Sequence, residues 1–348
     1  MSVNPPPRQS ASNRQFASSR QYEIAILGPG ALGSIIGAHL ARAGHSVAML
    51  ARGRRADFIS THGLTLTGVA EFSIPVTVLT DPASLRSADV LIVATKTPGT
   101  EAALARLRHV DISIAFSVQN GTMKNDLLAS VFTADRVLGS LADTSGEMLA
   151  DGRVLFTRNV NILLGELSGA LSQRAQDVAA TIDSSGVRAM AVPDILSLEW
   201  SKYVTWVGMF ALSVITRSVT WRYMVDEDAA LVLVRVTREM GRLAAALGIE
   251  LTDEANMPAA TLCRGTEAEA VAEVVKRGRV FESRSPQHRM SALQDLLAGR
   301  PLEVHETLGY ALRKGAAAGV PMPLLDGFYR VISAAERIRE AGAAAEGT

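Results

Sequence analysis

Residues 22–50 read YEIAILGPGALGSIIGAHLARAGHSVAML, and this stretch decides the fold of the first half of the chain. An apolar strand over 22–27 is expected to lead into a glycine-rich turn, a helix with an apolar face and a second strand ending at 50. Gly28, Gly30 and Gly33 fill the three glycine positions of a G-x-G-x-x-G fingerprint. The sequence therefore predicts a βαβ unit of the Rossmann, dinucleotide-binding type.

The turn residues have separate physical tasks in such a unit. The first glycine permits the tight turn, the second lets the backbone approach a pyrophosphate, and the third lets helix and strand pack closely. Unpaired N–H groups and the positive end of the helix dipole then favour a phosphate group. We therefore expect cofactor contacts along the whole turn, from Gly28, Pro29, Gly30, Ala31, Leu32 and Gly33.

The residues after the second strand bear on the choice of cofactor. A site for NADH usually has Asp or Glu about 20 residues past the glycines, where it binds the ribose hydroxyls. No acidic residue occurs between Ala31 and Ala56, and the strand is followed by Arg52, Arg54 and Arg55. Guanidinium groups suit a 2′-phosphate. The sequence predicts NADPH (NADP) with Arg52 as its first contact, and a solvated basic loop is the alternative interpretation.

Composition excludes several classes of protein. The 348 residues carry 35 Lys+Arg and 35 Asp+Glu, a balance that favours neither nucleic acid nor an anionic membrane as a partner. Cys263 is the single cysteine, so no internal disulfide framework or multi-cysteine metal site is expected, and we predict no metal. No apolar run reaches the roughly 18 residues of a membrane helix.

The chain is expected to have two domains after a short lead-in. Residues 1–20 are rich in Pro, Ser, Asn and Arg and lack an apolar signal core, so we predict a disordered lead-in and a cytoplasmic protein. Residues 21–192 are predicted to form the Rossmann-type α/β domain. Residues 193–348 are predicted to form an all-α domain, because helical apolar spacing continues through 194–216, 226–248, 266–278, 289–299 and 303–319.

Two further strands are expected to end near polar side chains. ADVLIVATK ends at Lys96, and ISIAFSVQNG ends at Asn120 and Gly121. Ligands of open α/β sheets bind beyond the carboxyl ends of the strands. Lys96 and Asn120 are therefore expected to face the nicotinamide end of the crevice, although either could be an ordinary polar residue after a strand. The strands expected over 136–148 and 153–166 are predicted to complete the same sheet.

From residues 22 to 332 the chain resembles the ketopantoate reductases, or 2-dehydropantoate 2-reductases. The resemblance rests on the glycine turn, Arg52, VATKT, VQNG, LEWSK, MSALQDLLAGRPLEV and GVPMP. The stretch SALQDLLAGRPLE is the most specific, because neither helix formation nor cofactor binding requires it. The resemblance implies reduction of a 2-oxo acid to a 2-hydroxy acid, by default ketopantoate to pantoate in pantothenate biosynthesis.

Individual roles are implied only where residues match the family's motifs. Lys202 matches the catalytic lysine that protonates the carbonyl oxygen, and Glu303 matches the catalytic acid that holds lysine, substrate and cofactor in position. Ser291 matches a serine that binds the substrate carboxylate. Asn120 and Lys96 match residues that line the crevice and contact both cofactor and substrate. The alternative for Lys202 is an ordinary lysine on the surface of a helix.

The chain departs from the family next to Lys202. Where the family usually has asparagines four and eight residues further on, this chain has Trp206 and Phe210. Both are expected to line the substrate pocket, with Thr205 or Ser213 as potential replacements for a lost hydrogen bond. A bulkier or more apolar 2-oxo acid is therefore a second candidate substrate. A non-catalytic NADPH-binding regulator and a homodimer are both open at this point.

Overall fold

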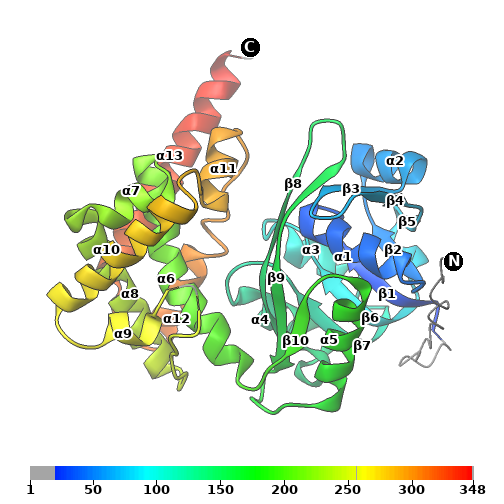
Figure 1. Ribbon diagram of the computed structural model, residues 1–348, viewed down its shortest axis with the longest axis horizontal. Helices are drawn as coiled ribbons and strands as arrows, with labels where there is room; N and C mark the ends of the chain where they lie inside the picture. The colour runs from blue at the N-terminus through cyan, green and yellow to red at the C-terminus, as the bar shows by residue number, and fades with distance from the viewer. Residues whose placement is uncertain (1–19, 256, 347–348) are drawn as a thin grey trace, which may run out of the picture.

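The structure is a computed structural model that describes residues 20–255 and 257–346, so the predicted lead-in lies almost entirely outside it. Figure 1 shows a part built on sheets beside a part built of helices. The first part contains a parallel five-stranded sheet in the order β5-β2-β1-β6-β7. Its strands are β1 (Tyr22–Leu27), β2 (Val47–Leu50), β5 (Thr77–Leu79), β6 (Ser87–Val93) and β7 (Asp111–Ser117). Helix α1 (Ala31–Arg42) connects β1 to β2, so the predicted βαβ unit is confirmed.

The strands expected to complete this sheet form a separate one, and that prediction was wrong. The second sheet runs β10-β9-β3-β4, with β8 paired to β9 in a long antiparallel hairpin. The physical reason is α1, which is buried on nearly all sides and packs against β3, β8 and β9 as well as the first sheet. The strands are β3 (Leu64–Gly68), β4 (Phe72–Ile74), β8 (Leu138–Met148), β9 (Val154–Glu166) and β10 (Ala189–Ala191).

Helices and short turns complete the first part, and the second part is entirely helical within the described residues. The first group comprises α2 (Gly53–His62), α3 (Thr100–Ala105), α4 (Met123–Phe132), α5 (Gln173–Ser185) and 3₁₀ turns at Pro82–Ser84 and Ala134–Arg136. The second comprises α6 (Ile195–Thr216), α7 (Thr220–Val225), α8 (Glu227–Ala246), α9 (Ala259–Cys263), α10 (Glu267–Arg284), α11 (Ser291–Leu297), α12 (Leu308–Ala317) and α13 (Pro323–Glu346). The predicted fold class, a Rossmann-type α/β part followed by an all-α part, is confirmed.

Two details of the helical part differ from the sequence prediction. The segment 304–307 forms turns, and α12 begins only at Leu308, because the backbone of Thr307, with φ of −108° and ψ of −83°, departs from helical geometry. Helices α7, α9 and α13 were not predicted. Gly248, Gly299 and Gly319 follow helices with φ between 66° and 72°, as expected of helix C-caps.

Helix α6 is the element that connects the two parts. It packs against α8, α11 and α13 in the helical part and against β8 and β9 in the first part (Figure 1). Because it is covered on most sides, its apolar residues are buried around nearly the whole helix. A buried polar side chain on α6 therefore needs a partner or a pocket. No described helix is long and apolar enough to cross a membrane.

Candidate active site

Lys202 lies on α6 where the helix faces strand β8. Its ammonium donates to the main-chain carbonyl of Ala142, with Nζ and O 3.0 Å apart. Burial, with a smaller contribution from the nearby ammonium of Lys124, lowers the pKa of Lys202 to about 8. An amine with this pKa holds a proton at neutral pH and releases it readily, which suits a general acid.

A narrow pocket lies between Lys202 and the end of β7. Asn120 and Gly121 form its wall on the side of the parallel sheet, at the carboxyl end of the strand where ligands of such sheets bind. The structure thus brings Lys202, Asn120 and Trp206 together in one pocket. The lining residues are Gln119, Asn120, Gly121, Lys124, Ser140, Leu141, Ala142, Glu199, Lys202, Tyr203 and Trp206.

Sequence reasoning missed a buried ion pair beside this pocket. The ammonium of Lys124 lies 3.1 Å from a carboxylate oxygen of Glu199, and the two side chains are only 3% and 2% exposed. Glu199 stands in the same LEWSK segment as Lys202, nearly one helical turn before it. The available signal was a carboxylate between Leu198 and Trp200 on a helix of largely apolar residues, because such a group is buried only with a partner.

The two aromatic residues occupy different positions around the pocket. Trp206 lines it, whereas Phe210 lies behind Trp206 in the core of the helical part, with ring centroids 5.3 Å apart. Thr205 and Ser213 do not replace the family's amides. The hydroxyl of Thr205 donates to the carbonyl of Lys202, and that of Ser213 donates to the carbonyl of Phe210.

Three other predicted residues lie outside this pocket lining. Lys96, three residues past the end of β6, is exposed and pairs with Asp295 of α11 at 2.7 Å. It was expected to face the nicotinamide end, but this carboxylate draws it towards the helical part. Glu303 is buried and accepts hydrogen bonds from the N–H and hydroxyl of Thr97, at 2.8 and 2.7 Å, whereas the ammonium of Lys202 is bonded to the carbonyl of Ala142. Ser291 begins α11, a helix packed against α6.

The glycine turn leaves space that a phosphate group fits. Gly28 has a φ of +94°, and a Cβ at this position would lie 2.5 Å from the side chain of Thr95. A Cβ at Gly33 would lie 2.3 Å from the carbonyl oxygen of Gly28, so the helix packs directly on the turn. At Gly30, by contrast, the nearest atom would be 3.7 Å away, and the first turn of α1 has no acidic residue and no side-chain cap. These features fit a pyrophosphate held by main-chain N–H groups.

The neighbouring arginines differ in their surroundings. Arg52 is exposed at the N-cap of α2, and among the described residues its guanidinium makes no hydrogen bond or ion pair. Arg55 is turned inward, donating to the carbonyls of Pro29 and Gly152 at 2.8 and 2.5 Å and to the hydroxyl of Ser34 at 2.7 Å. Burial lowers the pKa of Arg55 to about 10. Arg55 therefore supports the glycine turn, whereas the side chain of Arg52 extends into solvent beside it.

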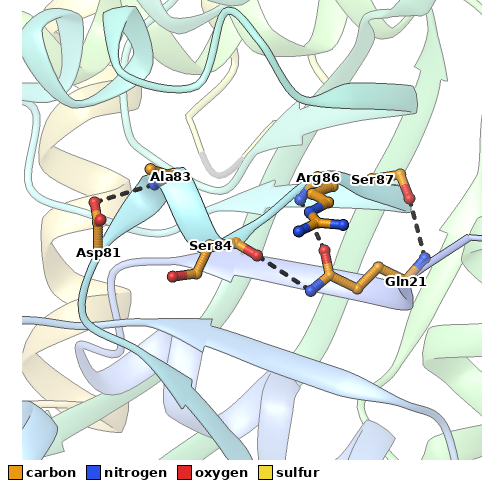
Figure 2. Close-up of a pocket in the computed structure, with 6 residues that line it drawn as sticks. All are labelled: Gln21, Asp81, Ala83, Ser84, Arg86 and Ser87. Atoms are coloured by element: carbon orange, nitrogen blue, oxygen red, sulfur yellow. Dashed lines mark hydrogen bonds between the residues drawn. The ribbon is translucent and has the colours of Figure 1, made fainter.

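Another hollow lies at the amino ends of the parallel strands, and Figure 2 shows the residues that line it. The N–H of Gln21 donates to the hydroxyl of Ser87, and the amide of Gln21 bonds the carbonyl of Ser84 and the N–H of Arg86. These polar groups satisfy one another at the amino ends of β1 and β6, away from the edge where ligands bind. The hollow therefore has no part in the candidate site. Within 20–255 and 257–346, no group of three or more His, Cys, Asp or Glu side chains is arranged for a metal ion.

A glycine turn that fits a pyrophosphate, and a lysine in a pocket at the carboxyl end of β7, are typical of a nicotinamide-dependent oxidoreductase. Sequence models of two parts of one family match this chain: ketopantoate reductase PanE/ApbA over residues 24–169, and its C-terminal part over 194–336. The chain belongs to the ketopantoate reductase family. This is a family of NADPH-dependent oxidoreductases that act on CH–OH groups.

Individual relatives agree with this assignment. The 2-dehydropantoate 2-reductase of Archaeoglobus fulgidus is 29% identical over 301 residues, which cover 86% of this chain and 93% of the relative. A PanE/ApbA family ketopantoate reductase from Ralstonia eutropha superposes with a TM-score of 0.77 at 24% identity, covering 91% and 99% of the two chains. D-mandelate dehydrogenase, solved with NADH and anilino(oxo)acetate, gives 0.77 at 21% identity and covers 90% and 98%. These two structures show the shared fold.

Proposed function

We propose that this protein reduces a 2-oxo acid to a 2-hydroxy acid with NADPH. The observation that carries the proposal is the amine of Lys202, with a pKa of about 8, in a pocket that opens at the carboxyl end of β7. The nicotinamide cofactor, when bound, supplies a hydride to the carbonyl carbon. Lys202 gives its proton to the carbonyl oxygen, so that negative charge does not accumulate there, and then takes a proton from solvent.

The other residues of the site hold the reactants. Main-chain N–H groups from Gly30 to Gly33 fit the pyrophosphate, and the exposed guanidinium of Arg52 fits a 2′-phosphate. Asn120 orients the carbonyl group from the opposite wall of the pocket. Ser291 is the candidate partner of the substrate carboxylate, on a helix packed beside α6. Glu303 fixes the loop after β6 through Thr97.

Ketopantoate is the first candidate substrate, because the family is named for it. A second candidate is a 2-oxo acid with an apolar side chain, because the indole of Trp206 lines the pocket where the family usually has an amide. An indole offers an apolar face and lacks the acceptor that the hydroxyl of ketopantoate would use. The fold neighbour D-mandelate dehydrogenase, crystallised with the aryl compound anilino(oxo)acetate, supports the second candidate.

The test is a panel of 2-oxo acids with NADPH or NADH, followed by the loss of reduced-cofactor absorbance. The panel contains ketopantoate, 2-oxoisovalerate, 2-oxoisocaproate, phenylpyruvate and benzoylformate. Lys202→Ala is the control, and it should lose roughly 10²–10⁴-fold in turnover while retaining cofactor affinity. The best substrate decides between the two candidates. No turnover of any member would favour the non-catalytic NADPH-binding regulator over the proposed reductase.

A further inference from the structure

The ion pair of Lys124 and Glu199 has no part in the proton transfer, yet it lines the same pocket as Lys202. Removing two charges from water is costly, and apolar residues of similar volume often stabilise a protein at least as well. Stability alone therefore gives no account of an ion pair whose side chains are 3% and 2% exposed. The pair's contacts indicate a different use.

Each contact of the pair reaches a different element of the site. The ammonium of Lys124 donates to the carbonyl of Gln119 at 3.0 Å and to the carbonyl of Ser140. Glu199 accepts from the N–H of Ser140 at 2.8 Å and from the amide of Asn125 at 2.6 Å. With the ion pair itself, all three N–H donors of the ammonium are used. The pair thus joins the turn after β7, strand β8 and helix α6.

These connections end next to the groups that the reaction uses. Gln119 precedes Asn120, and Ser140 stands two residues before Ala142, whose carbonyl accepts from Lys202. We propose that Lys124 is a positioning residue: its ammonium, held by Glu199, fixes the Asn120 turn and strand β8 relative to the amine of Lys202. This inference rests on the proposed function, in which Lys202 is the proton donor.

The charges around Lys202 support the same role. They are Lys124 from α4, Asp143 from β8, Arg158 from β9 and Glu199 from α6. After burial itself, Lys124 has the largest effect on the pKa of Lys202, and it lowers that pKa. A residue that only filled space would leave the titration of Lys202 unchanged.

The experiment compares two variants at the pair with one control. Lys124→Met keeps the aliphatic stem but leaves the carboxylate of Glu199 without its cation, so it is paired with the double variant K124M/E199L. That variant removes both charges and is expected to fold. Lys314→Met is the control, because Lys314 pairs with Asp126 of the same helix α4 at 2.7 Å and does not line the pocket.

Turnover and the titration of Lys202 are measured separately. For the folded double variant we expect kcat to fall about tenfold to a hundredfold, because the reacting groups lose their alignment, while the KM for NADPH stays near its normal value. Competitive labelling with trace acetic anhydride, read by mass spectrometry of the peptide containing Lys202, follows its titration without substrate. The midpoint should move to higher pH in both pair variants, and Lys314→Met should change neither readout.

Several results would overturn the proposal. A folded double variant with normal kcat removes the positioning role, whatever its stability. If neither pair variant folds, the ion pair serves only the stability of the fold, and the positioning role is likewise refuted. If the unmodified protein reduces no 2-oxo acid, the proposed function has failed. The pH midpoint of Lys202 labelling is then the only test of the link between Lys124 and Lys202. A shifted midpoint still supports the link between Lys124 and Lys202, and an unmoved midpoint refutes it.

Discussion

The pH dependence of catalysis is the most direct test of the assignment of Lys202. Reduction requires the protonated amine, and burial places its pKa at about 8. Such an amine is roughly one-tenth protonated at pH 9, where an unperturbed lysine would be roughly 95% protonated. The value of kcat/KM for reduction should therefore fall as pH rises through 8, by about tenfold for each further unit. Oxidation of the 2-hydroxy acid needs the neutral amine, so its rate should rise over the same range.

The assay is initial-rate kinetics in both directions between pH 6 and about 10, with cofactor affinity measured at each pH. Lys202→Arg is the informative control, because guanidinium keeps its proton throughout this range and should remove the break at pH 8. A reduction rate that stays level to pH 9, or breaks only near the pKa of an exposed lysine, would refute the reasoning. Either Lys202 would not be the proton donor, or its amine would not be buried in the working enzyme.

Three further predictions concern the cofactor turn and the pocket. Gly33→Ala should lower the free energy of unfolding by about 1–3 kcal/mol, because its Cβ meets a carbonyl. Gly30→Ala should leave the free energy of unfolding unchanged but weaken NADPH binding, as thermal unfolding and fluorescence titration would show. Arg52→Ala should weaken NADPH binding by roughly 1.5–3 kcal/mol and leave NADH nearly unaffected, with Arg54→Ala as control; equal use of both cofactors by the unmodified enzyme would contradict this. Trp206→Asn should shift kcat/KM towards ketopantoate by roughly 1–3 kcal/mol relative to apolar 2-oxo acids, unless ketopantoate is already the best substrate.

The sequence predicts most accurately the features that depend only on residues close together in the chain. The glycine turn could be read because φ and close approach restrict Gly28 and Gly33 to glycine within a single βαβ unit. Lys202, Asn120 and Trp206, each proposed separately for the site from its local sequence, line one pocket.

What the sequence could not show depends on contacts between distant residues. The partners Lys124 and Glu199 are 75 positions apart, and neither has a local pattern that names the other. The separate second sheet likewise follows from the burial of α1 on both faces, which no strand periodicity reveals. The contact of Glu303 with Thr97 joins two parts of the chain, so sequence position alone could not place it.

The acceptor that holds Lys202 belongs to the main chain of Ala142, and this has a consequence for how the enzyme can evolve or be engineered. No substitution at residue 142 removes that carbonyl, so the hydrogen bond from the Lys202 amine tolerates a change of side chain there. It depends instead on the course of the backbone, which shifts register against β9 between Ala142 and Thr144. Insertion or deletion of a single residue at this bulge would reverse which main-chain groups face α6. The hydrogen bond between Lys202 and Ala142 is thus robust to substitution at residue 142 and vulnerable to changes in the length of the hairpin.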